Sequence, residues 1–242
     1  MADDQHLSQI VTLWSVVRRA HDGKADSIRT AQQEMLDRYG GAVRRYLLGA
    51  LRDPDAADEV FQEFALRFVR GDFHSADPGL GRFRSYLKTV VYRLIVDYQR
   101  KQRRQGRQQP LPDDGPGFVA ETENQSDERF LQSWRDELLT RAWQELEELS
   151  RREETLHYEV LRLRAEQPSL RSMELAEKLS QSQGKAMTAG NVRVLLHRAR
   201  QRFAERLLEQ VSHSLATNDR EQVEQELITL NLHDYCRESL DA

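Results

Sequence analysis

Cations and aromatic side chains alternate along one predicted helix of the chain, and this combination suits a strand of nucleic acid. Pro78, Gly79 and Gly81 form a turn before the helix, which ends in an acid-free basic run at 100–107. Cations bind phosphates and aromatic rings stack on unpaired bases. A solvated amphipathic helix whose basic end complements its own dipole remains the alternative. The candidate nucleic-acid contacts are Arg82, Arg84, Lys88, Tyr92, Arg93, Arg100, Lys101, Arg103 and Arg104.

A second basic helix is predicted from Thr188, which can cap its N-terminus, to about Val211. Arginine and asparagine are the residue types best suited to paired hydrogen bonds with guanine and adenine. Two shorter helices precede this one, so the order suggests a helix-turn-helix, although the loop 180–187 is longer than the usual turn. The polar face, with the capping residue, consists of Thr188, Asn191, Arg193, Val194, His197, Arg198, Gln201 and Arg202.

The elements that position these residues are all expected to be helices, because no sustained alternation typical of strands occurs. Gly40-Gly41 is expected to kink or break one of them, and Asp53-Pro54 to start the next. The predicted helices cover residues 7–20, 27–51, 55–69, 83 to about 107, 126–149, 154–165, 172–179, 188–211 and 221–232.

The domain organisation follows from a segment rich in proline, glycine and acids that has little to bury. We interpret this segment, 105–125, as a flexible linker between two helical domains. The fold class is therefore all-α, with two domains and short terminal extensions. The predicted division is 1–26, 27–104, 105–125, 126–211 and 212–242.

The composition limits the function classes. The 242 residues carry a formal net charge of −4, 31% are charged and 38% hydrophobic, and no apolar run is long enough to cross a membrane. No secretory leader is expected, and Cys236, the sole cysteine, allows neither an internal disulfide nor a cysteine metal site. The cytoplasm is the expected compartment.

Enzyme signatures are absent from the sequence. There is no glycine-rich phosphate loop, no His-Glu-x-x-His and no Gly-x-Ser-x-Gly, and the seven histidines are scattered singly. We therefore expect no catalytic residues, metal or cofactor. Of the histidines, only His197 has a functional context, as a DNA contact.

Taken together, the two halves resemble a bacterial sigma factor of the sigma-70 family, in its extracytoplasmic-function (ECF) group. The acidic segment 57–67 resembles the helix that region 2 of that family docks on RNA polymerase. Segments 82–87 and 97–100 resemble the promoter-binding helix, and 190–200 resembles the upstream-element reader of region 4. The resemblance covers about residues 30–211.

The resemblance implies a transcription initiation factor that binds core RNA polymerase, directs it to promoter DNA and assists strand opening. Asp58, Glu59, Gln62 and Glu63 would bind the polymerase. The basic stretch at 82–104 would contact the −10 element, the loop 72–81 would accept a flipped base, and the polar face of the helix from Thr188 would read the −35 element. An anti-sigma protein or a regulatory kinase could control such a factor.

Two departures from the family pattern bear on specificity: Arg93 stands where members often have Asn, and Val194-Leu195 where many have a polar pair. The competing function is a helix-turn-helix repressor with a helical sensor domain, which would dimerise on palindromic sites. A third hypothesis is a helical adaptor that binds only protein. The repressor hypothesis gives no function to the acidic helix, and the adaptor hypothesis gives none to the two basic helices.

Overall fold

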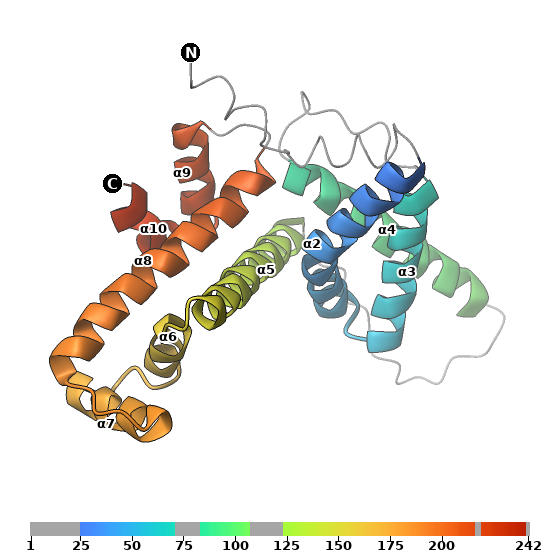
Figure 1. Cartoon of the computed structure of the whole chain (residues 1–242). Coiled ribbons are helices and arrows are strands. Elements are labelled where there is room, and N and C mark those ends of the chain that lie inside the picture. The colour runs from blue at the N-terminus through green and yellow to red at the C-terminus, as the bar shows by residue number, and fades with distance from the viewer. Residues whose placement is uncertain (1–24, 71–82, 107–122, 216–218, 241–242) are drawn as a thin grey trace, which may run out of the picture. The chain divides into compact units, whose positions relative to one another are not determined.

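The computed structural model describes residues 25–70, 83–106, 123–215 and 219–240, and every regular element among them is an α-helix (Figure 1). The expected all-α class is confirmed. The helices are α2 (Ala25–Leu51), α3 (Pro54–Arg70), α4 (Phe83–Gly106), α5 (Glu123–Arg152), α6 (His157–Glu166), α7 (Ser172–Gln183), α8 (Ala189–Ser214), α9 (Arg220–Thr229) and α10 (His233–Leu240). The predicted helix 7–20, the loop 72–81, Arg82 and most of the linker 105–125 lie outside the described residues.

The chain divides into two compact units. The first comprises Met1–Glu137 and His213–Asp219, and the second comprises Leu138–Ser212 and Arg220–Ala242. Two of the three boundaries between the units fall inside long helices, α5 and α8, and the third lies at the start of α9. The first turns of α5 thus associate with the first unit, whereas the predicted domain boundaries placed them after the linker.

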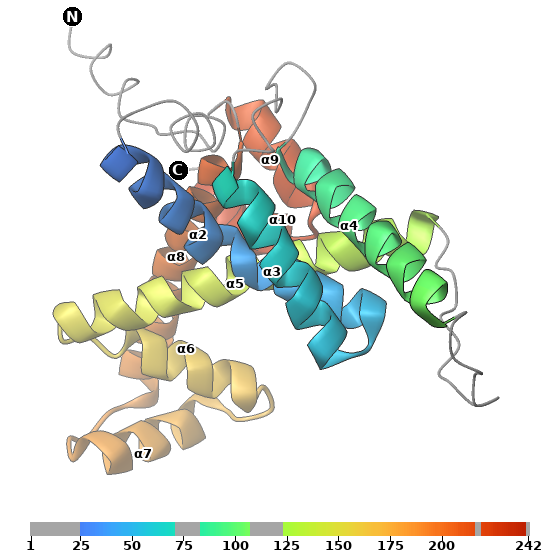
Figure 2. The ribbon, with the colours of Figure 1, turned by 90° about the vertical axis from the view of Figure 1, so that its right-hand side faces the viewer.

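The first unit is built on a bundle of α2, α3 and α4, seen from two directions in Figures 1 and 2. The first half of α5 adds an aromatic layer to it. The Trp134 ring stacks on Tyr39 at 5.1 Å between centroids, and Phe130 meets Tyr46 edge-on at 5.1 Å. All four rings are buried. Apolar burial on this scale is the main stabilising contribution to a helical domain.

The break expected at Gly40-Gly41 does not occur, because α2 is helical through both residues. The glycines serve close packing instead. A Cβ on Gly41 would collide with the carboxylate of Glu137, which accepts a hydrogen bond from Arg45 at 2.8 Å. Glycine at position 41 is therefore favoured by the approach of the Glu137 side chain and not by the backbone conformation of α2.

The apolar side of α4 is buried at its centre, where Leu87, Val91, Leu94 and Ile95 pack inside the unit. Tyr98, on the same side, is half-buried. The remaining side of α4 is thereby turned to solvent along its length.

The second unit contains the helix-turn-helix elements α7 and α8. The turn between them is shorter than predicted, because α7 continues to Gln183 and ends at Gly184, whose φ of 64° suits glycine. The Ser180 hydroxyl donates to Ala176 O at 2.6 Å and accepts from the Met187 amide at 2.8 Å, which ties the turn to α7. The turn is thus Gly184–Thr188, near the length usual for this motif.

The C-terminal segment also differs from the prediction of one helix over 221–232. The Leu232 amide donates to Leu227 O at 2.8 Å and Asn231 has a φ of 53°, so α9 ends there and α10 follows. The buried Cys236 of α10 lies with its Sγ 3.9 Å from Ala204 O of α8. Within the predicted C-terminal extension, α9 and α10 therefore belong to the second unit, and α10 packs on α8.

Candidate functional site

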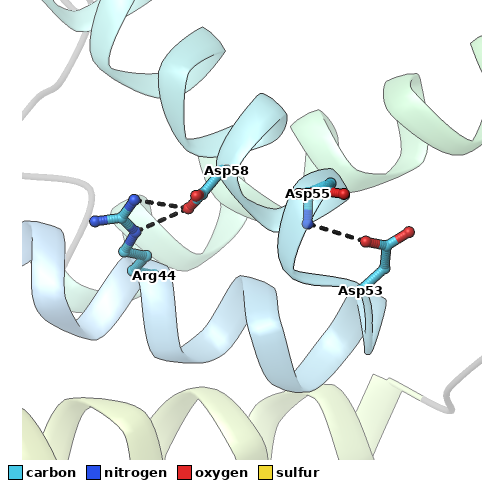
Figure 3. Close-up of polar contacts among 4 residues, drawn as sticks. All are labelled: Arg44, Asp53, Asp55 and Asp58. Carbon is cyan, nitrogen blue, oxygen red and sulfur yellow. Dashed lines mark hydrogen bonds and ion pairs between the residues drawn. The ribbon is translucent and has the colours of Figure 1, made fainter.

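The start of α3 fixes the orientation of the acidic face. The Asp53 carboxylate accepts from the amide of Asp55 at 2.9 Å (Figure 3). It also accepts from the amide of Ala56 at 3.3 Å, and Pro54 occupies the first helical position. This is a side-chain N-cap followed by proline, the arrangement that best satisfies the first free amides of a helix. Ala56, Ala57, Val60, Phe64 and Phe68 then bury the opposite face.

All three acids of the predicted polymerase-binding group lie at the surface of α3, and each is paired with a cation of the same unit. Asp58 accepts from Arg44 of α2 at 2.7 and 3.0 Å (Figure 3). Glu59 lies 3.2 Å from Lys101 Nζ of α4, with 51% of the Glu59 side chain and 60% of the Lys101 side chain exposed. Glu63 accepts from Arg67 Nε at 2.6 Å, and Gln62 is exposed between them.

These pairs are weak enough to be exchanged for a partner's cations. Ion pairs at exposed positions contribute about 0–1 kcal/mol because water screens them. A basic helical surface could displace Arg44 and Lys101 at little cost and would gain the closely spaced carboxylates. Asp58, Glu59 and Glu63 could therefore dock a basic partner, although each already has a cation in the chain itself.

The outward face of α4 carries the predicted basic and aromatic residues. Tyr92, Arg93, Arg100, Arg103 and Arg104 are exposed. Helical spacing places Tyr92, Arg93, Arg100 and Arg103 on one broad face, with Arg104 at the margin of that face. The face combines cations with an aromatic ring, and the exposed Asp97 lies beside it, one turn from Arg93 and Arg100.

Two lysines of the predicted group lie on the flanks of that face and are paired with acids. Lys88 contacts the carboxylate of Asp127 on α5, and Lys101 contacts Glu59. Arg84 is half-buried near the start of α4. The half-buried Tyr86 has a pKa raised above its ordinary value of 10.0 by burial, with nearby Arg93 opposing the shift. Lys88 and Arg84 are therefore less accessible for phosphate than the outward arginines, whereas Lys101 remains exposed in a weak pair.

The N-terminus of α8 is capped as predicted. The Asn191 amide donates to Thr188 Oγ1 at 3.1 Å, and the Val192 amide donates to Thr188 O at 3.1 Å. Val192, Leu196, Ala199, Phe203 and Leu207 are buried along one side. The opposite side is consequently held outward from a well-fixed helix start.

The outward side of α8 contains nearly all the predicted reader residues. Asn191, Arg193, Val194, His197, Arg198 and Gln201 are exposed. Val194 is 53% exposed and is the one large apolar side chain among them. Arg193 Nε donates back to Ala189 O at 3.2 Å, and Arg202 lies 3.4 Å from Glu205. The arrangement offers a polar surface with one methyl-bearing residue in its middle.

Sequence reasoning missed the cations that pair with the acidic face and the packing of α10 on α8. Arg44 stands fourteen positions from Asp58 in the sequence, so no helical spacing connects the two. The short amphipathic pattern around Cys236 was the only signal for α10. Among the described residues no cluster of three potential ligands could hold a metal ion, and no described helix meets the length and hydropathy of a membrane span.

These surfaces define a helical protein with an acidic face and two separate basic faces, a combination suited to joining a basic protein partner to DNA. Residues 35–105 match the family model of sigma-70 region 2, a range that contains both the acidic face of α3 and the basic-aromatic face of α4. The match supports a sigma-70 family sigma factor with a role in transcription initiation, a family of transcription factors and not of enzymes. Sigma factors bind core RNA polymerase and promoter DNA. Neither the curated proteins nor the solved structures give a match.

Proposed function

We propose that this chain is a sigma factor of the ECF group that binds core RNA polymerase through α3 and places it on promoters with paired −10 and −35 elements. The observation that carries the proposal is the region 2 match over α2 to α4, which spans a solvent-exposed acidic face and a solvent-exposed basic-aromatic face. Asp58, Glu59, Gln62 and Glu63 form the polymerase-binding face. In the cell the factor acts in the cytoplasm, where the polymerase is.

On the proposed promoter complex, the outward residues of α4 follow the −10 strand. Exposed arginines neutralise phosphates and Tyr92 stacks on an unpaired base. The capped start of α8 enters the major groove of the −35 element, as the second helix of a helix-turn-helix does. Residues 27–104 and 126–211 act as the two promoter-reading domains, joined by the linker 105–125.

Core dependence of DNA binding separates this function from the repressor. A gel-shift experiment would use a library of duplexes and the full chain with and without core polymerase. We expect selection of a common sequence only when core is present, with two elements that are not inverted repeats. Selection of a palindrome by the chain alone would establish the repressor instead.

A further inference from the structure

A cavity of 410 Å³ lies within the second unit and is lined by side chains of α5, α6, α8 and α10. Its size falls in the range of small-molecule sites, which are concave, mostly apolar and provided with a few polar groups. Neither the acidic face nor the outward face of α4 contributes to it. The cavity is thus separate from the surfaces assigned above to polymerase and to the −10 strand.

The floor of the cavity is apolar and aromatic. Phe203, Ala204 and Leu161 are buried beneath it, and the Trp143 ring lies 4.9 Å from the Phe203 ring at an interplanar angle of 50°. Tyr235 of α10 closes one side and remains largely exposed. Aromatic walls of this kind hold a flat, rigid ring better than a flexible chain, because the ring loses little freedom on binding.

The rim of the cavity carries more positive than negative charge. Arg164, Arg200 and Arg237 line it from three different helices, and Asp234 and Glu238 line it from α10 alone. Arg164 Nη1 donates to Pro168 O at 3.1 Å and to Leu170 O at 2.5 Å. Its guanidinium is therefore held in place before any ligand arrives. Guanidinium groups bind carboxylates and sulfonates through parallel N–H donors and also stack on aromatic faces.

We propose that this cavity binds a small aromatic anion, such as an aromatic carboxylate or sulfonate, with its ring on the Trp143–Phe203 floor and its charge at the arginines. The proposal does not rest on the function proposed above. It does place the ligand against α8, because Arg200 and Gln201 belong both to the cavity wall and to the helix whose outward face is assigned to DNA.

Two matched dyes test the charge and the ring separately. 8-Anilinonaphthalene-1-sulfonate is an aromatic anion, and N-phenyl-1-naphthylamine has the same rings without the sulfonate. Isothermal titration calorimetry of the full chain should show one equivalent of the sulfonate bound, about tenfold or more tightly than the neutral dye, since charge-assisted hydrogen bonds favour the anion. Arg237→Glu should weaken the sulfonate by about tenfold and leave the neutral dye unchanged. Arg152→Glu, an exposed control on α5, should change neither.

A filling variant tests the location. Ala165 is exposed at the cavity edge, so Ala165→Trp should block both dyes without disturbing the core. Gln144→Trp on α5 lies outside the cavity and should bind both dyes as the parent chain does. Circular dichroism confirms that each variant is folded. Absence of binding, equal affinity for both dyes, several equivalents, or unchanged binding by Arg237→Glu and Ala165→Trp would each overturn the proposal.

Discussion

Arg193 and Arg202 lie on one helix, and we expect them to contribute to promoter recognition in different ways. They are nine residues apart, about two and a half turns, so they stand on opposite flanks of the outward face of α8. Arg193 lies in the first turns, where a recognition helix approaches base edges, and Arg202 lies further from that end. We therefore predict that Arg193 reads a base and that Arg202 binds phosphate.

The magnitudes follow from the contacts each arginine gives up. Arg193 must leave an exposed hydrogen bond to Ala189 O, which contributes about 0.5–1.5 kcal/mol at most, whereas a paired contact to guanine discriminates by about 1–3 kcal/mol. Arg193→Ala should then lower transcription from the preferred element by roughly 5- to 150-fold and relax the preference at one base pair. Arg202→Ala should weaken all elements alike and reduce the salt slope by about 0.9.

The assay is run-off transcription with core polymerase on a library of −35 elements placed upstream of one constant −10 element. Thermal unfolding of each variant checks that the second unit remains folded. If both variants lose activity equally and without regard to sequence, Arg193 is not a base reader, and the arginines of α8 act only as solvating or phosphate-binding charge.

Three further predictions concern the folded chain. Limited proteolysis should cut first within 105–125 because of its proline and glycine content, and a resistant segment would contradict the linker. Gly41→Ala should lower the free energy of unfolding by about 1–3 kcal/mol, because the added methyl group clashes with Glu137. Gly190→Ala, whose methyl group would meet no close atom, should be neutral or stabilising by about 0.5–1 kcal/mol. Urea denaturation measures both variants, and equal effects would refute the packing argument. Burial, and then neighbouring arginines, lowers the pKa of His157 below its ordinary value of 6.5, so the neutral ring is favoured in the folded chain. The stabilisation that comes from a neutral His157 is present above about pH 6.5 and is lost as the pH falls. His157→Gln should therefore flatten the dependence of the free energy of unfolding on pH, and an unchanged dependence would contradict this prediction.

Helical periodicity predicted the fold well wherever one face of a helix is buried. On α8 the predicted polar positions Asn191, Arg193 and His197 are exposed, and Thr188 caps the helix as the sequence predicts. Both features are local, because spacing and cap chemistry act over one or two turns. The outward positions of the basic residues follow from the same spacing.

Contacts between distant segments could not be predicted in the same way. The break expected at Gly40-Gly41 rests on local propensity alone, whereas Gly41 meets the side chain of Glu137, almost a hundred positions later. The pairing of Glu59 with Lys101 and the packing of Cys236 on α8 likewise join segments that no periodicity relates. The predicted loop before α8 is longer than the observed turn because serine disfavours helix interiors, whereas Ser180 completes its hydrogen bonds within α7 and the turn.

The affinity of the full chain for core RNA polymerase in the absence of DNA tests the central claim most directly. Glu59→Lys with Glu63→Lys should weaken it by several kcal/mol, the size found for close charge pairs at interfaces, because each reversed side chain meets a basic partner. Stability should change little, since only exposed ion pairs are lost. Glu147→Lys with Glu148→Lys, the same charge change on α5, should bind as the parent chain does. We predict that the parent chain and the α5 control bind core polymerase tightly and that the α3 variant does not. Undiminished binding by the α3 variant, or no binding by the parent chain, would contradict the account.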